Sequence, residues 1–134
     1  MTHRHGEQPG GEFLIAAGAL LAGLGVAAGA FGAHYLKGSL NSDQLDIWHT
    51  AANYQMYHAL ALIVAARLLS RHPTRLLRAA CGLFLAGILL FSGSLYLLAL
   101  TDASILGVIT PLGGLAFLAA WGCLAVGIVR DTLP

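Results

Sequence analysis

The residues from Phe13 to Phe31 form an unbroken apolar run without a single charged side chain. A helix rises about 1.5 Å per residue and the hydrocarbon core of a bilayer is about 30 Å thick, so a run of this length spans a membrane as a helix. Three further runs have a similar length, and the four predicted spans lie at about 13–33, 50–69, 76–100 and 105–129. The sequence therefore predicts an all-α integral membrane bundle of four transmembrane helices.

The composition supports a membrane protein. Hydrophobic residues make up 57% of the 134 residues and charged residues only 10%, whereas soluble domains carry about 25% charged residues. The missing polar surface implies that membrane lipid surrounds the protein. We expect one domain over 13–134, preceded by a flexible polar tail at 1–12. The net charge of +1 gives no argument for binding nucleic acid.

The short loop at 70–75, which joins the second and third spans, indicates the orientation of the bundle. Four of the basic residues surround it, namely Arg67, Arg71, Arg75 and Arg78. By the positive-inside rule this loop is cytoplasmic, and both termini then also lie in the cytoplasm. Pro73 prevents the second and third helices from fusing. The loops at 34–49 and 101–104 are then expected outside.

Two local signals predict where helices begin in the outer loops. Asn41 is followed three residues later by Gln44, the pattern of a capping box, so a helix is expected to start near Asp43 and lead into the second span. Pro111 either takes the first position of a helix capped by Thr110 or kinks a longer helix. We expect a break or kink at Thr110–Pro111, with residues 105–109 partly re-entrant.

Small residues at intervals of three and four run along the first span. Gly25 and Gly29 have the spacing that lets two helix backbones approach closely. This contact lies either within one chain or between subunits, so a homo-oligomer is one of the expected arrangements.

Polar side chains in the second span indicate a site. Tyr54, Gln55 and His58 fall at positions that share one helix face with Ala51. Lipid cannot satisfy an amide or an imidazole, so this face must contact protein, water or a ligand. A neutral imidazole needs a donor and an acceptor, and Tyr54 and Gln55 are close enough on the helix to hold its tautomer. His58 is either an interhelical hydrogen-bond node or a group that binds a ligand, a proton or a metal.

Polar residues of the other spans lie at the same outer depth, whereas the inner half of the bundle is almost purely apolar. They come from the end of the first span, the late part of the third and the start of the fourth. Together with the second span they predict either an outward-opening cavity or a hydrogen-bonded core. The predicted ligand-binding residues are His34, Tyr54, Gln55, His58, Ser92, Tyr96 and Thr110.

No metal, cofactor or catalytic group is predicted. His49 and His58 are nine positions apart, which separates them by about 13.5 Å along one helix. His34 and His58 have no Cys, Asp or Glu beside them to complete a metal site. The spans contain no Ser–His–Asp set, no glycine-rich phosphate loop and no carboxylate pair, so we expect a non-enzymatic protein. Cys81 and Cys123 are expected as buried apolar side chains, with a disulfide as the alternative.

Four motifs carry a resemblance to a known family: Gly29–Lys37 (GAFGAHYLK), Thr50–Leu62 (TAANYQMYHALAL), Ser92–Thr101 (SGSLYLLALT) and Ile109–Trp121 (ITPLGGLAFLAAW). With them the chain resembles the domain-of-unknown-function 423 family, whose bacterial members are similar to the eukaryotic transmembrane protein 256 family. The resemblance implies a small, multi-pass, four-helix protein of the bacterial inner membrane, and it implies no activity. Tyr35 stands where many relatives have glycine, which leaves the turn after the first helix open.

By position, the family motifs point to Gly29, Gly32, His34, Tyr54, Gln55, His58, Pro111, Gly113 and Gly114. The predicted helix-packing residues are Gly25, Gly29, Gly32, Pro111, Gly113 and Gly114.

Three functions remain open. The leading hypothesis is a non-enzymatic membrane protein whose outer-leaflet polar pocket around His58 holds a lipid, a quinone or another small amphipathic ligand. The second is a structural or assembly subunit of a membrane complex, and the third is a conduit for protons or small solutes through an oligomer. The space around His58 distinguishes them: an outward-open cavity favours the first, a filled cluster the second, and a water-lined path to the arginine loop the third.

Overall fold

The computed structural model describes residues 9–132, in which helices are joined by short turns and no strand occurs. The elements are α1 (Pro9–His34), a 3-10 turn η1 (Leu36–Gly38), α2 (Ser42–Arg71), α3 (Arg75–Gly87), a π-helical segment η2 (Ile88–Ser92), α4 (Gly93–Thr101) and α5 (Leu106–Thr132). Because α3, η2 and α4 follow one another directly, they form one rod. The four rods confirm the predicted all-α bundle.

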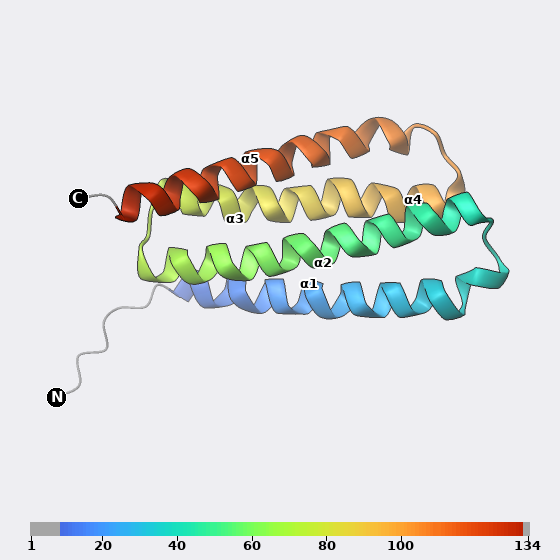
Figure 1. Cartoon of the computed structure of the whole chain (residues 1–134), viewed down its shortest axis with the longest axis horizontal. Coiled ribbons are helices and arrows are strands. Elements are labelled where there is room, and N and C mark those ends of the chain that lie inside the picture. The colour runs from blue at the N-terminus through green and yellow to red at the C-terminus, as the bar shows by residue number, and fades with distance from the viewer. Residues whose placement is uncertain (1–8, 133–134) are drawn as a thin grey trace.

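The rods lie antiparallel, and α2 is central (Figure 1). α1 packs along α2, α2 packs against the α3–η2–α4 rod, and that rod packs against α5. The start of α1, the end of α5 and the α2–α3 turn all lie at one end of the bundle (Figure 1). This agrees with an even number of spans, while the side of the membrane on which this end lies stays a prediction.

Three stretches of the described chain are long and apolar enough to cross a membrane: Gly10–Gly38, Arg75–Thr101 and Leu106–Arg130. α2 is the longest helix, with 30 residues, or about 45 Å, but its polar side chains lower its hydropathy. It lies between α1 on one side and the α3–α4 rod on the other (Figure 1). Its buried polar residues, Gln55 and His58, therefore have protein neighbours and need not face lipid.

The predicted capping box is present at the start of α2. The Gln44 amide donates to Asn41 Oδ1 at 2.9 Å, and the Asn41 amide donates to Gln44 Oε1 at 3.1 Å. This box starts α2 at Ser42, well before the apolar run that begins at Thr50. At the other end of α2, Pro73 lies between two helices, and Thr74 caps α3.

The first and last helices differ from the predicted bounds. α1 begins at Pro9, inside the range predicted as a tail, and proline suits the first position of a helix. The rest of that range, 1–8, lies outside the described residues. Of the predicted break or kink near Pro111, the break is wrong, because α5 continues through Pro111, while a kink in this longer helix stays a prediction. α5 is entered through 3-10 bonds, such as Val108 N–H to the Ile105 carbonyl. Pro111 lies early in the helix, where its missing amide leaves only the Gly107 carbonyl without its helical donor.

Glycines form the seam between α1 and α2. Every seventh residue of α1 from its first turn is a glycine that faces α2: Gly11, Gly18, Gly25 and Gly32. A Cβ built on Gly18 would lie 2.6 Å from a side-chain carbon of Ile63, and one built on Gly25 would lie 3.6 Å from Met56 Cε. A seven-residue repeat of contacts is typical of helices that cross at a small left-handed angle. The glycines allow this close approach along the whole seam.

The predicted helix-packing residues divide by what surrounds them. Gly25 and Gly32 lie in the seam, whereas a Cβ on Gly29 would meet no atom within 4 Å. Gly113 lies directly against the backbone of Phe91, which brings α5 close to η2. Gly114 lies beside the same phenylalanine with more room, and Pro111 is exposed.

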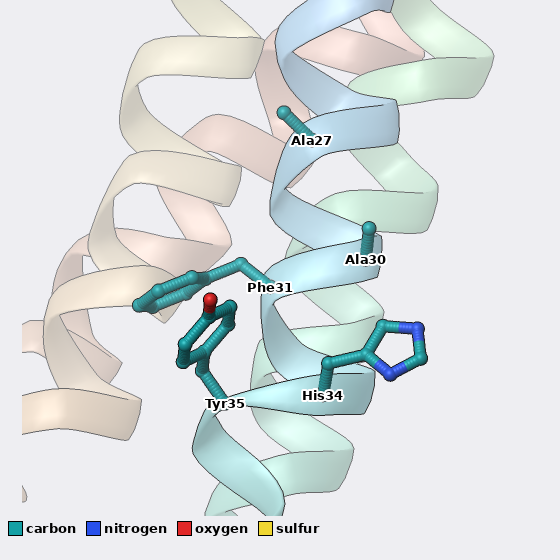
Figure 2. A pocket seen from close by; sticks show the side chains of 5 residues that line it. All are labelled: Ala27, Ala30, Phe31, His34 and Tyr35. Carbon is teal, nitrogen blue, oxygen red and sulfur yellow. The ribbon is translucent and has the colours of Figure 1, made fainter.

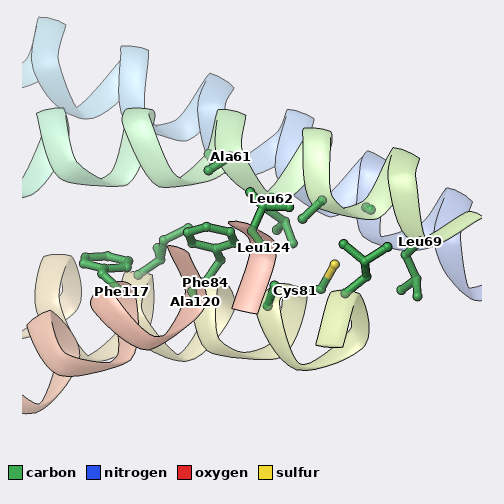
Figure 3. Close-up of a cluster of buried hydrophobic side chains, with 14 residues drawn as sticks. Ala61, Leu62, Leu69, Cys81, Phe84, Phe117, Ala120 and Leu124 are labelled. Atoms are coloured by element: carbon green, nitrogen blue, oxygen red, sulfur yellow. The ribbon is translucent and has the colours of Figure 1, made fainter. Parts of the chain in front are cut away.

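An apolar core fills the half of the bundle nearer the α2–α3 turn. It lies among α2, α3 and α5 and includes Leu62, Leu77, Phe84 and Leu124 (Figure 3). Cys81 is buried in it, Cys123 packs against it, and both are free thiols rather than a disulfide. Within a bilayer such a core is stabilised by tight van der Waals packing.

Candidate functional site

The predicted site residues do not meet in one cavity, because α2 has neighbours on two sides. Gln55 points toward α1 and α4, whereas His58, three residues later, points toward α5. The Tyr96 hydroxyl bonds to Gln55, and the Tyr54 ring stacks beside His58 at 5.7 Å between centroids. Thr110 pairs with Ser94 between α5 and α4, whereas Ser92 and His34 lie apart from these groups. Each place has its own chemistry.

Gln55 ties three helices together. Its side chain is buried, its Nε2 donates to the Leu21 carbonyl of α1 at 2.8 Å, and its Oε1 accepts from the Tyr96 hydroxyl of α4 at 2.9 Å. An amide has two N–H donors, and among the described residues only the Leu21 carbonyl accepts from this one. One N–H of Gln55 is therefore left for another acceptor.

Trp48 repeats this contact two turns earlier on α2. The indole N–H donates to the Ala28 carbonyl of α1 at 2.8 Å, and its ring lies 4.6 Å from the Tyr96 ring, centroid to centroid. The two accepting carbonyls belong to Leu21 and Ala28, which precede Gly25 and Gly32 by one turn each. The glycine seam thus lets side chains of α2 reach the α1 backbone.

Sequence reasoning did not include Trp48 among the site residues. The signal was present, because Trp48 and Gln55 are seven positions apart and so share one helix face. Its position just before the second span indicated an anchor at the membrane interface, whereas its indole N–H bonds to the α1 backbone inside the bundle.

A cavity of about 320 Å³ opens beside this cluster, between α1 and the η2–α4 part of the third rod. It exists because α1 packs on α2 rather than on that rod. Its polar lining consists of Gln55, Trp48 and Tyr96, and a Cβ on Gly93 would meet no atom within 4 Å. We call it the Gln55–Tyr96 groove. Its other lining residues are apolar: Leu21, Leu24, Ala28, Ile88 and Leu89.

His58 lies in a packed aromatic cluster. Its Nδ1 is 2.7 Å from the Tyr54 carbonyl, so Nδ1 carries the hydrogen and donates. The imidazole stacks on Phe117 with centroids 3.5 Å apart and an angle of 7° between the planes. The ring centroids of Phe84 and Trp121 lie farther from the imidazole centroid, at 6.0 and 6.1 Å. The Tyr54 backbone, rather than the side chains of Tyr54 and Gln55, thus fixes the tautomer.

The hydroxyls of the third and fourth spans form a separate link. Ser94 Oγ and Thr110 Oγ1 are 2.7 Å apart, and each also lies within hydrogen-bond distance of a carbonyl of its own rod, that of Phe91 or of Leu106. Two hydroxyls carry two hydrogens, so one hydroxyl donates to the other and the remaining hydrogen goes to one of the carbonyls. Ser92 is 1% exposed, yet its hydroxyl has no partner among the described residues. Ser92 ends the π-helical segment, in which the usual spacing of carbonyls is altered.

His34 lies away from all of these groups. It is exposed at the end of α1, where Ala27, Ala30, Phe31 and Tyr35 line a shallow hollow of about 490 Å³ with it. Its imidazole points away from the paired rings of Phe31 and Tyr35 (Figure 2). The structure therefore brings Gln55 and Tyr96 together, and Ser94 with Thr110, but not His34 with His58.

These elements correspond to a known family. The family described as "Protein of unknown function (DUF423)" matches residues 28–114, from the end of α1 to the first part of α5. The chain belongs to this family. The matched range contains Trp48, Gln55, His58 and Tyr96, so the DUF423 region includes most of the groove and the imidazole.

Similar proteins are named as membrane proteins. The chain is 49% identical to the UPF0382 membrane protein YwdK of Bacillus subtilis, over 89% of this chain and 98% of YwdK. It is 46% identical to a UPF0382 membrane protein of Staphylococcus haemolyticus, over 89% of this chain and 97% of that protein. No solved structure matches the chain. These relatives and the apolar helices identify this DUF423 protein as a membrane protein.

Proposed function

We propose that this protein is a non-catalytic, multi-pass protein of the bacterial inner membrane that holds a small amphipathic ligand in the Gln55–Tyr96 groove. The observation that carries the proposal is a cavity of about 320 Å³ with mainly apolar walls and a polar floor. Small-molecule sites are typically apolar hollows of about 300–1,000 Å³ with a few fixed polar groups.

The chemistry of the floor suggests what the ligand carries. Gln55 uses one N–H and its carbonyl within the bundle, so its other N–H suits a carbonyl acceptor. Apolar walls suit a hydrocarbon or isoprenoid tail. An ester lipid and a quinone both combine such a tail with carbonyl oxygens.

The space around His58 is filled, which favours a structural role for His58 itself, so the ligand hypothesis moves from His58 to Gln55. Aromatic rings fill the space around the imidazole, with Phe117 stacked at 3.5 Å. The apolar core then fills the bundle beyond it, toward the arginine loop. A conduit would need a polar path through this region, so the proton or solute conduit is the least favoured function.

A structural or assembly subunit is the second candidate. Its supporting observation is that Gln55, Trp48 and the Ser94–Thr110 pair use their polar groups to join helices. In this alternative the groove is covered by lipid or by another subunit, including a second copy of this chain.

A matched pair of glycine variants separates the two candidates. Gly93→Val places a side chain in the groove without a clash, and Gly82→Val adds the same side chain at another position on the same rod where a Cβ also meets no atom within 4 Å. Native mass spectrometry of protein released in mild detergent is the measurement. We expect a defined added mass on the wild type and on Gly82→Val that is lost from Gly93→Val. The same mass on Gly93→Val, or no added mass on an intact wild type, would contradict the ligand function.

A further inference from the structure

A second cavity lies at the opposite end of the bundle from the Gln55–Tyr96 groove. It has a volume of about 260 Å³ and is formed by the start of α1, the end of α2, the α2–α3 turn and the start of α3. Leu14, Leu69 and Pro73 give it apolar walls, and Arg78 provides its charged group. The remaining lining residues are Gly10 and Gly11.

The arginines at this end have no ion-pair partner among residues 9–132. The side chains of Arg67, Arg71, Arg75 and Arg78 are all exposed. Within residues 9–132, none of their guanidinium groups makes an ion pair or a hydrogen bond with another residue. An arginine guanidinium is always charged and forms paired hydrogen bonds with phosphate oxygens. These groups are therefore available to an anionic ligand.

The start of α1 brings backbone N–H donors to the cavity, while Glu12 in the same turn offsets part of the positive potential of the helix end. Gly10 and Gly11 belong to its first turn, where backbone N–H groups have no partner within the helix. The amino end of a helix of this length also has a partial positive charge. Both glycines line the cavity together with Arg78.

The position of the cavity indicates a lipid. Arg78 lies one turn into the α3–α4 rod, which is apolar enough to cross a membrane from Arg75 to Thr101, so the cavity is at the level where headgroups meet hydrocarbon. Basic pockets at the ends of transmembrane helices bind anionic lipid headgroups. We propose that this cavity binds the phosphate group of an anionic phospholipid, with the start of the acyl region against Leu14 and Leu69.

Two arginines with the same charge give a matched test. Arg78 lines the cavity, whereas Arg67 is exposed and does not. Wild type, Arg78→Gln and Arg67→Gln are placed in nanodiscs of phosphatidylcholine mixed with phosphatidylglycerol, and the lipids that stay bound are counted by native mass spectrometry. We expect phosphatidylglycerol to be preferred by the wild type and by Arg67→Gln, and retained roughly fivefold less by Arg78→Gln.

A steric variant makes the test independent of charge. A Cβ on Gly10 meets no atom within 4 Å, so Gly10→Leu projects into the cavity without disturbing the helix seam, and we expect it to lower the bound phosphatidylglycerol as well. Circular dichroism checks that each variant remains helical.

Three results would overturn the proposal. Equal losses in Arg67→Gln and Arg78→Gln would mean a general surface attraction. An absence of preference for phosphatidylglycerol in the wild type would mean no anionic site. Displacement of the lipid by inorganic phosphate at millimolar concentration would mean a site for free anions rather than for a lipid.

Discussion

Gln55 and His58 are three residues apart on the same helix, but the regions around them are built in different ways. The side-chain amide of Gln55 donates to the Leu21 carbonyl and accepts from the Tyr96 hydroxyl, and the Gln55–Tyr96 groove lies open beside it. His58 makes one bond to its own helix and is otherwise enclosed by aromatic rings. A buried polar side chain in this bundle is thus accommodated either by hydrogen bonds to other helices, as for Gln55, or by packing against aromatic rings, as for His58. Of these two regions of the described chain, the one around Gln55 contains the cavity.

The largest expected effect comes from breaking the packed region. Phe117→Ala removes the ring stacked on His58 and leaves a cavity among α2, α3 and α5, so we expect a loss of about 3–5 kcal/mol in the free energy of unfolding. Thermal unfolding in detergent, followed by circular dichroism, measures it. Phe13→Ala is the control, because Phe13 is 74% exposed. Equal melting temperatures for the two variants would show that the His58 region is not a packed core.

A smaller effect is expected from removing the polar floor of the groove. Gln55→Leu removes the acceptor of the Tyr96 hydroxyl and the side-chain donor to the Leu21 carbonyl. We expect it to lower the free energy of unfolding by about 1–2 kcal/mol. Because Tyr96→Phe removes the same bond from the other side, the double variant should cost less than the sum of the two single variants. Additive losses in chemical unfolding would mean that the Gln55–Tyr96 bond contributes nothing to stability.

The smallest expected changes in the free energy of unfolding come from two serines on the α3–η2–α4 rod, Ser94 and Ser92. Ser94→Ala removes the hydroxyl bonded to Thr110 and is expected to cost about 0.6 kcal/mol, the average for hydrogen bonds between transmembrane helices. Ser92→Ala removes a buried hydroxyl without a partner among residues 9–132 and is expected to leave stability unchanged or slightly raised. A larger loss for Ser92→Ala than for Ser94→Ala in the same unfolding assay would reverse this order.

The sequence was sufficient for the fold because its signals were local. Apolar runs of spanning length predicted the helices, and the Asn41–Gln44 capping box predicted the start of α2. The predicted break at Pro111 was wrong because a proline early in a long helix removes only one backbone hydrogen bond, and the rest of α5 holds the helix together. The π-helical segment 88–92 was missed, since no residue pattern in that stretch distinguishes it from an ordinary α-helix.

The site was less predictable, because it depends on which helices are neighbours. The helical spacing places Tyr54, Gln55 and His58 on one side of α2, but it does not reveal that two different partners divide this side between them. The role of Trp48 depends on the Ala28 carbonyl of α1. Because every residue has a backbone carbonyl, the amino-acid sequence does not indicate which carbonyl accepts this hydrogen bond. A glycine at every seventh position of α1 was the available clue to that contact.

The glycine seam also bears on how the chain enters the membrane. α2 carries the polar side chains that make it less apolar than the other three rods, so it gains less from leaving water on its own. α1 is synthesised first, is strongly apolar, and offers α2 a smooth surface with two backbone carbonyls for Gln55 and Trp48. Insertion of α1 and α2 as a paired hairpin lets the second helix bring its amide and indole into lipid already bonded.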